Sequence, residues 1–198
     1  MGKIFYLIGK SCAGKDSLYN ELIKDDKLGL LPVIRYTTRP IRDGEADGVS
    51  YHFVDMIGYK ELKDTGKIIE EQVYHTIHGD WYYFTADDNG IDLSAHSYLA
   101  IGVPGSYAGT RDHYGKDKVV PIYIELDDGE RLQRALDRER LPGNGRYAEM
   151  CRRFLADADD FCEERIRELE IPDEARFEND DLKDCAKRVR EWILKSIR

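Results

Sequence analysis

The chain alternates short apolar runs with longer segments in which apolar residues recur at helical spacing. The apolar runs are bounded by Gly, Pro and Asp, and they predict strands at residues 4–8, 33–36, 97–103, 119–125 and 176–178. The helical patterns cover residues 15–24, 105–114, 129–140, 146–169 and 181–197. The last of these has the clearest apolar face, formed by Leu182, Ala186, Val189, Ile193 and Ile197. This alternation predicts an α/β fold whose mostly parallel sheet is covered by helices on both faces.

Residues 36–86 interrupt the alternation. The stretches "YHFVD", "KIIEEQVYHT" and "WYYFT" predict short strands around one helix at 55–65, with "IHGD" as a hairpin tip. We therefore expect a single domain over 1–198, with a core of 1–35 and 87–198 and a small α+β insertion at 36–86. The stretch "LPGNG" at 141–145 separates two Arg-rich helices and predicts a mobile tip.

Composition narrows the classes of partner. The 198 residues carry a formal net charge of −9, which argues against a broad nucleic-acid or membrane-binding surface but leaves room for a local cationic pocket. The four cysteines show no CxxC spacing, so we expect reduced thiols in a cytoplasmic protein, as a monomer or homodimer. No run approaches the roughly 20 apolar residues that span a bilayer, and the first apolar run is too short for a signal peptide.

The first candidate site is the loop "GKSCAGK" at residues 9–15, between a predicted strand and a predicted helix. Backbone N–H groups at a helix N-terminus bind phosphate oxygens, and Lys15 would reach the β- and γ-phosphates of ATP. The alternative is a plain glycine-rich turn. We expect the ATP site to include Gly9, Lys10, Ser11, Cys12, Ala13, Gly14, Lys15, Asp16 and Ser17.

The residue after the loop lysine is unusual. A hydroxyl at that position normally faces Mg²⁺, but here Asp16 occupies it and Ser17 follows. A carboxylate there would repel a triphosphate unless a cation stands between them. We therefore predict that Asp16 and Ser17 lie near Mg²⁺, directly or through water.

The second candidate site is "YTTRPIRDGEADGVSYHFV" at residues 36–54. Two guanidinium groups, on Arg39 and Arg42, lie three residues apart among hydroxyls that include Tyr51. Each guanidinium can bind a dianionic phosphate monoester with two hydrogen bonds. The alternative is a solvated turn with incidental charges.

These two motifs, with "IIEE", "YYFT", an Arg-rich segment and "ENDD", resemble the guanylate kinase family over nearly the whole chain. The resemblance implies a P-loop core, a nucleoside-monophosphate-binding insertion at 36–86 and a lid at about 134–153. It also implies Mg²⁺-dependent transfer of a phosphoryl group from ATP to GMP. The positions that it assigns to GMP are Arg39, Arg42 and Tyr51, with Glu70 on the base and Tyr83 and Thr85 as further phosphate and base contacts.

The role that the resemblance gives to Glu70 has a physical basis. Guanine presents adjacent N1–H and N2–H donors, and one carboxylate can accept from both, whereas adenine offers no such pair. Without the neighbouring motif, an exposed strand carboxylate would be the simpler interpretation of Glu70.

Two further features gain roles from the resemblance. It assigns Arg134, Arg138 and Arg153 to the lid, where arginines neutralise charge on the transferring phosphoryl group with the help of Lys15. The alternative is a helix surface of ion pairs, since acidic residues are interleaved with the arginines. Asn179 in "ENDD" is assigned to the adenine of ATP, although Asn179 or Asp180 can also cap the last helix.

The chain departs from the family in three places. Arg35 stands where a serine contacts the substrate, Ala100 and Gly102 replace strand aspartates, and Phe84 replaces a glycine expected beside the base. "GKDSL" and "RYTTR" also resemble ribose 1,5-bisphosphate phosphokinases, and an added guanidinium at Arg35 suits a substrate with more phosphate charge. GMP remains the expected substrate because Glu70 has no role toward a sugar bisphosphate. A non-catalytic guanylate-kinase-like binding module is a third alternative, disfavoured because it needs neither Lys15 nor the lid arginines.

Overall fold

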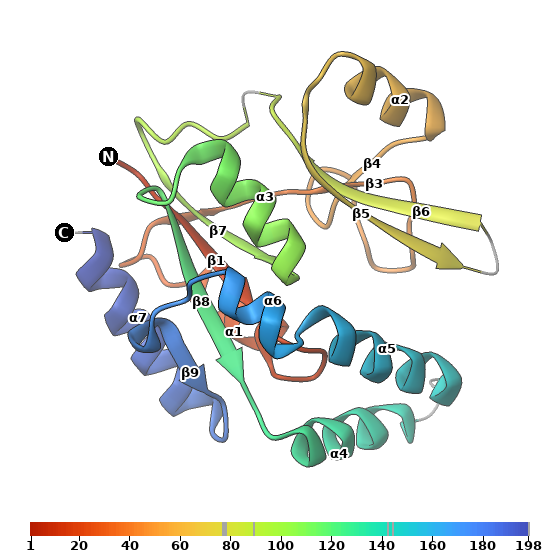
Figure 1. Ribbon diagram of the computed structural model, residues 1–198, viewed down its shortest axis with the longest axis vertical. Helices are drawn as coiled ribbons and strands as arrows, with labels where there is room; N and C mark the ends of the chain where they lie inside the picture. The colour runs from red at the N-terminus through yellow and green to blue at the C-terminus, as the bar shows by residue number, and fades with distance from the viewer. Residues whose placement is uncertain (77–78, 89, 142, 144, 198) are drawn as a thin grey trace.

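A parallel sheet of five strands forms the centre of the computed structural model, which describes residues 1–76, 79–88, 90–141, 143 and 145–197. The strand order is β2–β7–β1–β8–β9, and every pairing is parallel (Figure 1). The bounds are β1 Ile4–Ile8, β2 Leu30–Pro32, β7 Ser97–Gly102, β8 Val119–Glu125 and β9 Arg176–Glu178. The α/β fold with a mostly parallel sheet is thus confirmed.

Helices cover both faces of this sheet, and the alternation of side chains along β1 shows why. Phe5 and Leu7 point to one face, where they are buried in a cluster with residues of α1 (Lys15–Leu22) and α7 (Leu182–Ile197). Ile4, Tyr6 and Ile8 point to the other face and belong to a cluster with residues of α3 (Pro104–Tyr114). Because β1 is buried on both faces, its apolar run is continuous.

A second sheet is built from the segment that interrupts the sequence pattern. Its order is β4–β3–β6–β5, with bounds β3 Tyr36–Thr37, β4 His52–Phe53, β5 Ile68–Thr76 and β6 Gly79–Ala86. Helix α2 (Met56–Asp64) covers one face, where Tyr59, Phe84 and Ala86 form a small core. The other face meets α3 through β5 (Figure 1).

Two predicted elements differ from the structure. The strand expected at 33–36 is wrong, because Leu30–Pro32 pairs with β7 and the chain then crosses to the second sheet at Tyr36. The helix expected at 146–169 is two helices, α5 (Tyr147–Asp160) and α6 (Glu163–Glu168). The break lies at Phe161, which is buried and stacks on Tyr123, followed by an extended Cys162. Burial of this ring turns the chain back toward the sheet.

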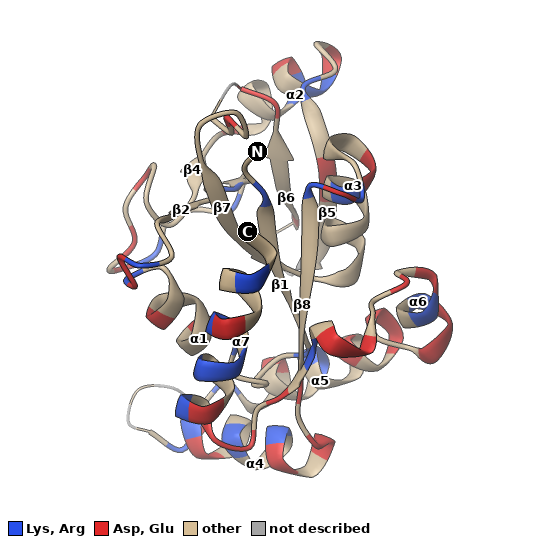
Figure 2. Ribbon diagram, turned by 90° about the vertical axis from the view of Figure 1, so that its left-hand side faces the viewer, with Lys and Arg blue, Asp and Glu red and all other residues tan. Residues whose placement is uncertain are grey.

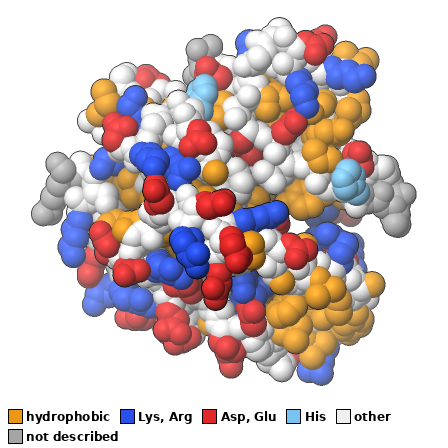
Figure 3. Space-filling view, in the orientation of Figure 1, with side chains coloured by type: hydrophobic (Ala, Val, Ile, Leu, Met, Phe, Trp, Pro, Cys, Tyr) orange, Lys and Arg blue, Asp and Glu red, His pale blue; other side chains and the backbone are white. Residues whose placement is uncertain are grey.

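The segment from β8 to β9 projects from the core as helices α4 (Asp128–Glu139) and α5, with η1 (Asp173–Ala175) before β9 (Figure 1). Apolar side chains gather on the surface over α4 and α5 in Figure 3, and Leu141, Tyr147 and Leu155 are among the exposed ones. The tips predicted at "IHGD" and "LPGNG" include residues 77, 78, 142 and 144, which lie outside the described residues. Among the helices in the described ranges, none is long and apolar enough to cross a membrane.

Candidate active site

The glycine loop joins β1 to α1 and is held in a tight backbone path. Cys12 and Gly14 both have positive φ, 62° and 92°. A Cβ atom at Gly14 would lie 2.1 Å from Nδ2 of Asn179, so this position needs glycine for its conformation and for space. The predicted strand–loop–helix geometry is therefore present, with the loop packed against the residue expected at the adenine.

Lys15 is the first residue of α1 and directly follows Gly14 of the glycine loop. Its ammonium group donates to the carbonyl oxygen of Lys10 at 2.9 Å. Burial lowers the pKa of Lys15, and the charges of Asp16 and Asp157 oppose that shift only in part. A bound polyphosphate would place negative charge beside this ammonium group and so favour its protonated form.

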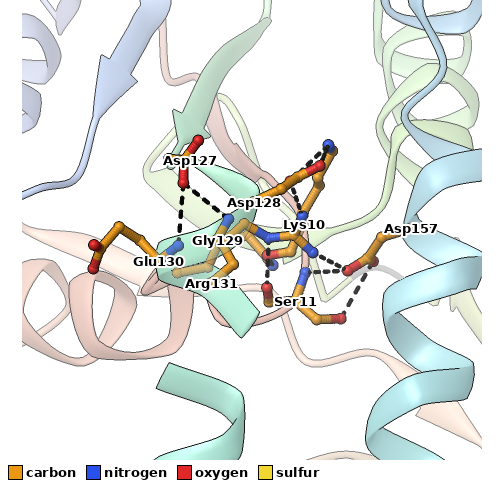
Figure 4. A network of polar contacts seen from close by, with 9 residues as sticks. Lys10, Ser11, Asp127, Asp128, Gly129, Glu130, Arg131 and Asp157 are labelled. Atoms are coloured by element: carbon orange, nitrogen blue, oxygen red, sulfur yellow. Dashed lines mark hydrogen bonds and ion pairs between the residues drawn. The ribbon is translucent and has the colours of Figure 1, made fainter. Parts of the chain in front are cut away.

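A network of charged groups ties the loop to α4 and α5 (Figure 4). Asp157 of α5 accepts from the backbone N–H and the hydroxyl of Ser11 at 2.8 and 3.2 Å, and from Arg131 at 2.6 Å. The buried Arg131 also donates to the Ser11 carbonyl at 2.9 Å and pairs with Asp128, which binds Lys10. No local pattern in the sequence points to Asp157, because it meets its partners only when the helices fold back onto the loop.

The three expected lid arginines lie near the glycine loop. Arg138 and Arg153 line a small pocket together with Ser11 and Cys12. Nη1 of Arg134 lies 3.9 Å from the place that a Cβ atom at Gly14 would take, and Nη2 donates to the backbone carbonyls of Asn179 and Asp180 at 3.1 and 3.3 Å. The structure thus places the glycine loop, the "ENDD" segment and the arginines around one region.

The helices that carry the expected lid arginines also match, in part, the alternative of a surface of ion pairs. Figure 2 shows basic and acidic residues mixed along α4, α5 and α6. Arg153 donates to Glu149 at 2.8 Å and is nearly half exposed. Hydrogen bonds from Arg152 and then Arg153 lower the pKa of Glu149 to about 2. Surface pairs of this kind are weak, so they leave Arg153 free to exchange partners.

Asn179 lies against the glycine loop and does not cap the last helix. Its Nδ2 donates to the carbonyl of Ala13 at 2.7 Å, and its Oδ1 is buried with no hydrogen-bond partner among the described residues. Asp181, not Asn179 or Asp180, caps α7 by accepting from the N–H of Asp184 at 2.9 Å. The capping prediction is wrong because Asn179 turns inward to the loop, where it leaves one acceptor unused.

The residues expected near Mg²⁺ lie at the start of α1. Asp16 and Ser17 are exposed, and no cluster of three acidic, His or Cys side chains occurs in the parts of the chain that are described. Strand β7 offers no carboxylate, and at Gly102 a Cβ atom would come within 2.6 Å of the Tyr6 hydroxyl. An exposed carboxylate and hydroxyl beside the phosphate loop fit a Mg²⁺ ion that keeps most of its ligands from phosphate and water.

The arginine motif forms a closed cluster in the second sheet. The guanidinium of Arg39 donates to both oxygens of Glu45 at 2.8 and 2.9 Å and to the Tyr83 hydroxyl at 3.0 Å. Its charge lies 5.4 Å from the centre of the Tyr51 ring. The side chain of Arg42 is exposed, while its N–H donates to Glu45. Of the expected phosphate ligands, Arg39, Tyr51 and Tyr83 are therefore together, and Arg42 reaches them through its backbone N–H, which donates to Glu45, the partner that holds Arg39.

Glu70 is buried, and its carboxylate is already bonded. Arg35 donates to Oε1 and Oε2 at 2.8 and 3.0 Å, and the Thr85 hydroxyl donates to Oε1 at 2.6 Å. Helix α3 closes over this pair, because Ser106 accepts from Arg35 at 3.1 Å and Gly109 leaves room for Glu70. The simpler interpretation of Glu70 as an exposed strand residue is wrong.

Phe84 points away from Glu70. It is fully buried and stacks on Tyr36 with ring centroids 5.2 Å apart, on the face of the sheet covered by α2. Adjacent residues of a strand point to opposite faces, so Tyr83 and Thr85 face Arg39 and Glu70 while Phe84 faces the small core. Phe84 therefore lies on the opposite face of β6 from the residue that the resemblance assigns to the base.

Comparisons with known proteins agree with these motifs. Residues 1–85 match the family model described as guanylate kinase. The guanylate kinase of Chromobacterium violaceum is 39% identical over 80 residues, which are 40% of this chain and 38% of that protein. The guanylate kinase of Anaplasma phagocytophilum is 30% identical over 139 residues, which are 69% of this chain and 63% of that protein. The matched part spans less than two thirds of either relative.

A solved structure gives the same fold over a longer part of the chain. The crystal structure of guanylate kinase from Anaplasma phagocytophilum aligns with a TM-score of 0.68 at 21% sequence identity. The alignment covers 98% of this chain and 85% of that chain. The resemblance to guanylate kinases is therefore confirmed: in sequence it is strongest over 1–85, and in fold it covers nearly the whole chain.

Proposed function

We propose that this chain transfers the γ-phosphoryl group of ATP to GMP, giving ADP and GDP. The observation that carries the proposal is the pocket in which Arg138 and Arg153 meet Ser11 and Cys12 of the loop that holds Lys15. Phosphoryl transfer needs positioning and charge neutralisation more than a strong base. Loop amides, one buried ammonium group and two guanidinium groups supply both.

The acceptor phosphate is assigned to the cluster around Arg39. Burial raises the pKa of Tyr51, and the charges that act on this hydroxyl include those of Arg35, Arg39 and Asp16. Asp16 stands at the ATP loop and Arg39 in the second sheet, so Tyr51 lies within electrostatic reach of both candidate sites. In this assignment Arg39 leaves Glu45 in part and binds the GMP phosphate together with Arg42, Tyr51 and Tyr83.

The donor nucleotide is assigned to the loop. Asn179 would accept from the adenine amino group through its unused Oδ1, and Arg134 would hold the "ENDD" segment in place. Asp16 and Ser17 would hold Mg²⁺, which neutralises phosphate charge when bound.

The test is a coupled assay of purified protein with ATP and GMP, with AMP, CMP and ribose 1,5-bisphosphate as alternative acceptors. GMP is expected to be phosphorylated and AMP and CMP rejected. Lys15→Met should lower kcat by about a hundredfold, in line with loss of one preorganised charge at the transferring group. Phosphorylation of ribose 1,5-bisphosphate with none of GMP would overturn the substrate assignment. Absence of transfer to any acceptor would favour the binding-module alternative.

A second variant tests the base assignment. Glu70→Gln should raise the KM for GMP far more than the KM for ATP, because only GMP reaches that carboxylate. Equal effects on the two KM values would remove Glu70 from the base site.

A further inference from the structure

Arg35 changes what Glu70 can recognise. Oε1 of Glu70 accepts from three donors, namely Nε and Nη2 of Arg35 and the hydroxyl of Thr85, whereas Oε2 accepts only from Nη2 of Arg35. A carboxylate offers about four lone-pair positions, two on each oxygen. The bonds within the described structure therefore fill Oε1 and leave one acceptor position at Oε2.

Guanine needs two acceptors from a carboxylate that reads both N1–H and N2–H. With one position left, Glu70 can accept from one of these groups while Arg35 stays bound. Removal of Arg35 from Glu70 would strand a guanidinium whose side chain is only 13% exposed, next to a carboxylate that is 3% exposed. Separation of such a buried pair is costly, so the pair persists when the base enters.

The same guanidinium keeps unused donors. Nε and Nη2 of Arg35 serve Glu70, the Ser106 hydroxyl and, at 3.5 Å, the Tyr83 carbonyl. Nη1 makes no hydrogen bond to any residue that the structure describes, so its two N–H groups are available. The charge of Arg35 opposes the rise that burial causes in the pKa of Tyr51 and of Tyr74.

We propose that Arg35 is a specificity-determining residue that donates from Nη1 to O6 of guanine, while Oε2 of Glu70 accepts from N1–H. This inference rests on the proposed GMP kinase activity. O6 and N1–H are adjacent on guanine, and the free donor and the free acceptor belong to the two members of one bonded pair, Arg35 and Glu70. Adenine presents a donor at position 6 and an acceptor at N1, which places like against like.

The Arg35–Glu70 pair also predicts which group of guanine contributes least to recognition. Because Glu70 has one free acceptor position, N2–H of guanine contributes little to binding. Inosine monophosphate keeps O6 and N1–H but lacks the 2-amino group, so it is expected to be a good substrate. 6-Thioguanosine monophosphate keeps both donors but carries sulfur, a weaker acceptor, in place of O6, so it is expected to be a poor one.

The experiment compares kcat/KM for GMP, inosine monophosphate and 6-thioguanosine monophosphate in the wild type and in Arg35→Ser. In the wild type, kcat/KM for 6-thioguanosine monophosphate should be about ten- to a hundredfold lower than kcat/KM for GMP, the range for a hydrogen bond to a charged donor, and kcat/KM for inosine monophosphate should be less than about threefold lower. In Arg35→Ser, kcat/KM for the 6-thio substrate should be less than about threefold lower than for GMP. In the same variant, kcat/KM for inosine monophosphate should be more than about tenfold lower than for GMP, because Oε1 is then free to accept from N2–H.

These penalties are ratios within one protein preparation, so partial misfolding of the variant cancels. If Arg35→Ser is too slow to assay, calorimetric affinities for the three nucleotides should give the same two opposite shifts. Arg35→Lys, which keeps the charge and one donor toward the base, should retain most of the 6-thio penalty.

The outcomes separate the inference from the proposed function. If the wild type phosphorylates GMP and the fall in kcat/KM from GMP to the 6-thio substrate is equally large in Arg35→Ser, the inference is overturned and the kinase activity stands. If both penalties are unchanged by Arg35→Ser, Arg35 only supports the fold near Glu70. If the wild type neither binds nor phosphorylates GMP, the proposed function fails and the role of Arg35 fails with it.

Discussion

At the scale of single residues, the departures at Asp16, Ala100 and Gly102 are best understood together. Gly102 has no room for a side chain because the Tyr6 hydroxyl fills the space, so β7 offers no carboxylate at that position. Asp16 stands exposed at the first turn of α1, next to Lys15. The helix N-terminus partly offsets its charge. The chain thus carries a carboxylate beside the glycine loop and none on β7.

The first prediction concerns magnesium. Asp16→Asn should raise the Mg²⁺ concentration that gives half-maximal activity by about tenfold, since an amide oxygen is a weaker ligand for Mg²⁺ than a carboxylate. The measurement is a magnesium titration of activity at saturating ATP and GMP. Asp26→Asn, also exposed but beyond the end of α1, is the matched control and should behave as the wild type. An unchanged titration in Asp16→Asn would exclude a role at the metal.

The second prediction concerns pH. Burial lowers the pKa of Lys15, so as pH rises its ammonium group loses its proton earlier than an exposed lysine, whose pKa is about 10.4. The folded pKa lies below the unfolded one, so protonation of Lys15 opposes folding at low pH and that cost disappears as pH rises. Function changes in the opposite direction, because the neutral amine no longer attracts phosphate.

The affinity for ATP should therefore weaken as pH rises from about 7 to about 10, measured by calorimetry at fixed ionic strength. Lys15→Arg, which stays protonated throughout this range, should bind ATP with an affinity that changes little. The same alkaline loss in both proteins would assign the titration to another group.

At the scale of elements, α3 determines the space around Glu70. Gly105 and Gly109 lie four residues apart and face β5, and α3 makes close contact with that strand. A Cβ atom at Gly109 would lie 2.5 Å from the Cβ atom of Glu70, whereas one at Gly105 would lie 2.8 Å from the end of the Gln72 side chain. Only the second contact can be relieved by rotation of a flexible side chain.

The third prediction compares these two glycines. Gly105→Ala should leave activity unchanged and keep or slightly raise the melting temperature, because Gly105 lies in the first turn of α3, where alanine gains less than the ~1 kcal/mol of a helix interior. Gly109→Ala should move Glu70, raise the KM for GMP severalfold and leave the KM for ATP unchanged. Its overpacking cost of about 1–3 kcal/mol offsets the gain in helix propensity. Equal kinetics in the two variants would show that α3 adjusts freely over β5.

At the scale of the whole molecule, the two candidate nucleotide sites belong to different sheets. Lys15 follows a strand of the parallel sheet, while Arg39 lies in the second sheet beside Tyr83. Each ligand should therefore stabilise the protein through its own sheet. A ligand at about one hundred times its Kd adds about 2.7 kcal/mol, which for a chain of this size raises Tm by about 5–10 °C.

The fourth prediction separates the two sites by thermal unfolding with each ligand alone. Lys15→Met should abolish the shift produced by ATP and keep the shift produced by GMP. Arg39→Met should keep the shift produced by ATP and abolish the shift produced by GMP. Its Tm without ligand should be lower than that of the wild type, because Glu45 loses its partner. Loss of both shifts in either variant would show that the sheets unfold and bind as one unit.

Much of the architecture was predictable because it depends on local patterns. Apolar runs of strand length, apolar residues at helical spacing and the glycines of residues 9–14 are patterns among residues that are close in sequence. These patterns predicted the parallel sheet and the loop. The motif at 36–54 likewise predicted a cluster, of which the structure brings Arg39 and Tyr51 together while the side chain of Arg42 stays exposed. The functional roles of these residues remain predictions.

The tertiary structure alone decided the partners. Asp157 is 146 residues from Ser11, and Arg35 is 35 residues from Glu70, so no local pattern pairs them. Phe161 breaks a helical period because the core has space for its ring, and Phe84 faces away from Glu70 because side chains alternate along its strand. The sequence by itself determined which chemical groups are available and on which elements they lie. Packing determined which charges meet in the buried sites, because burial makes each charge require a partner that only the folded chain can bring to it.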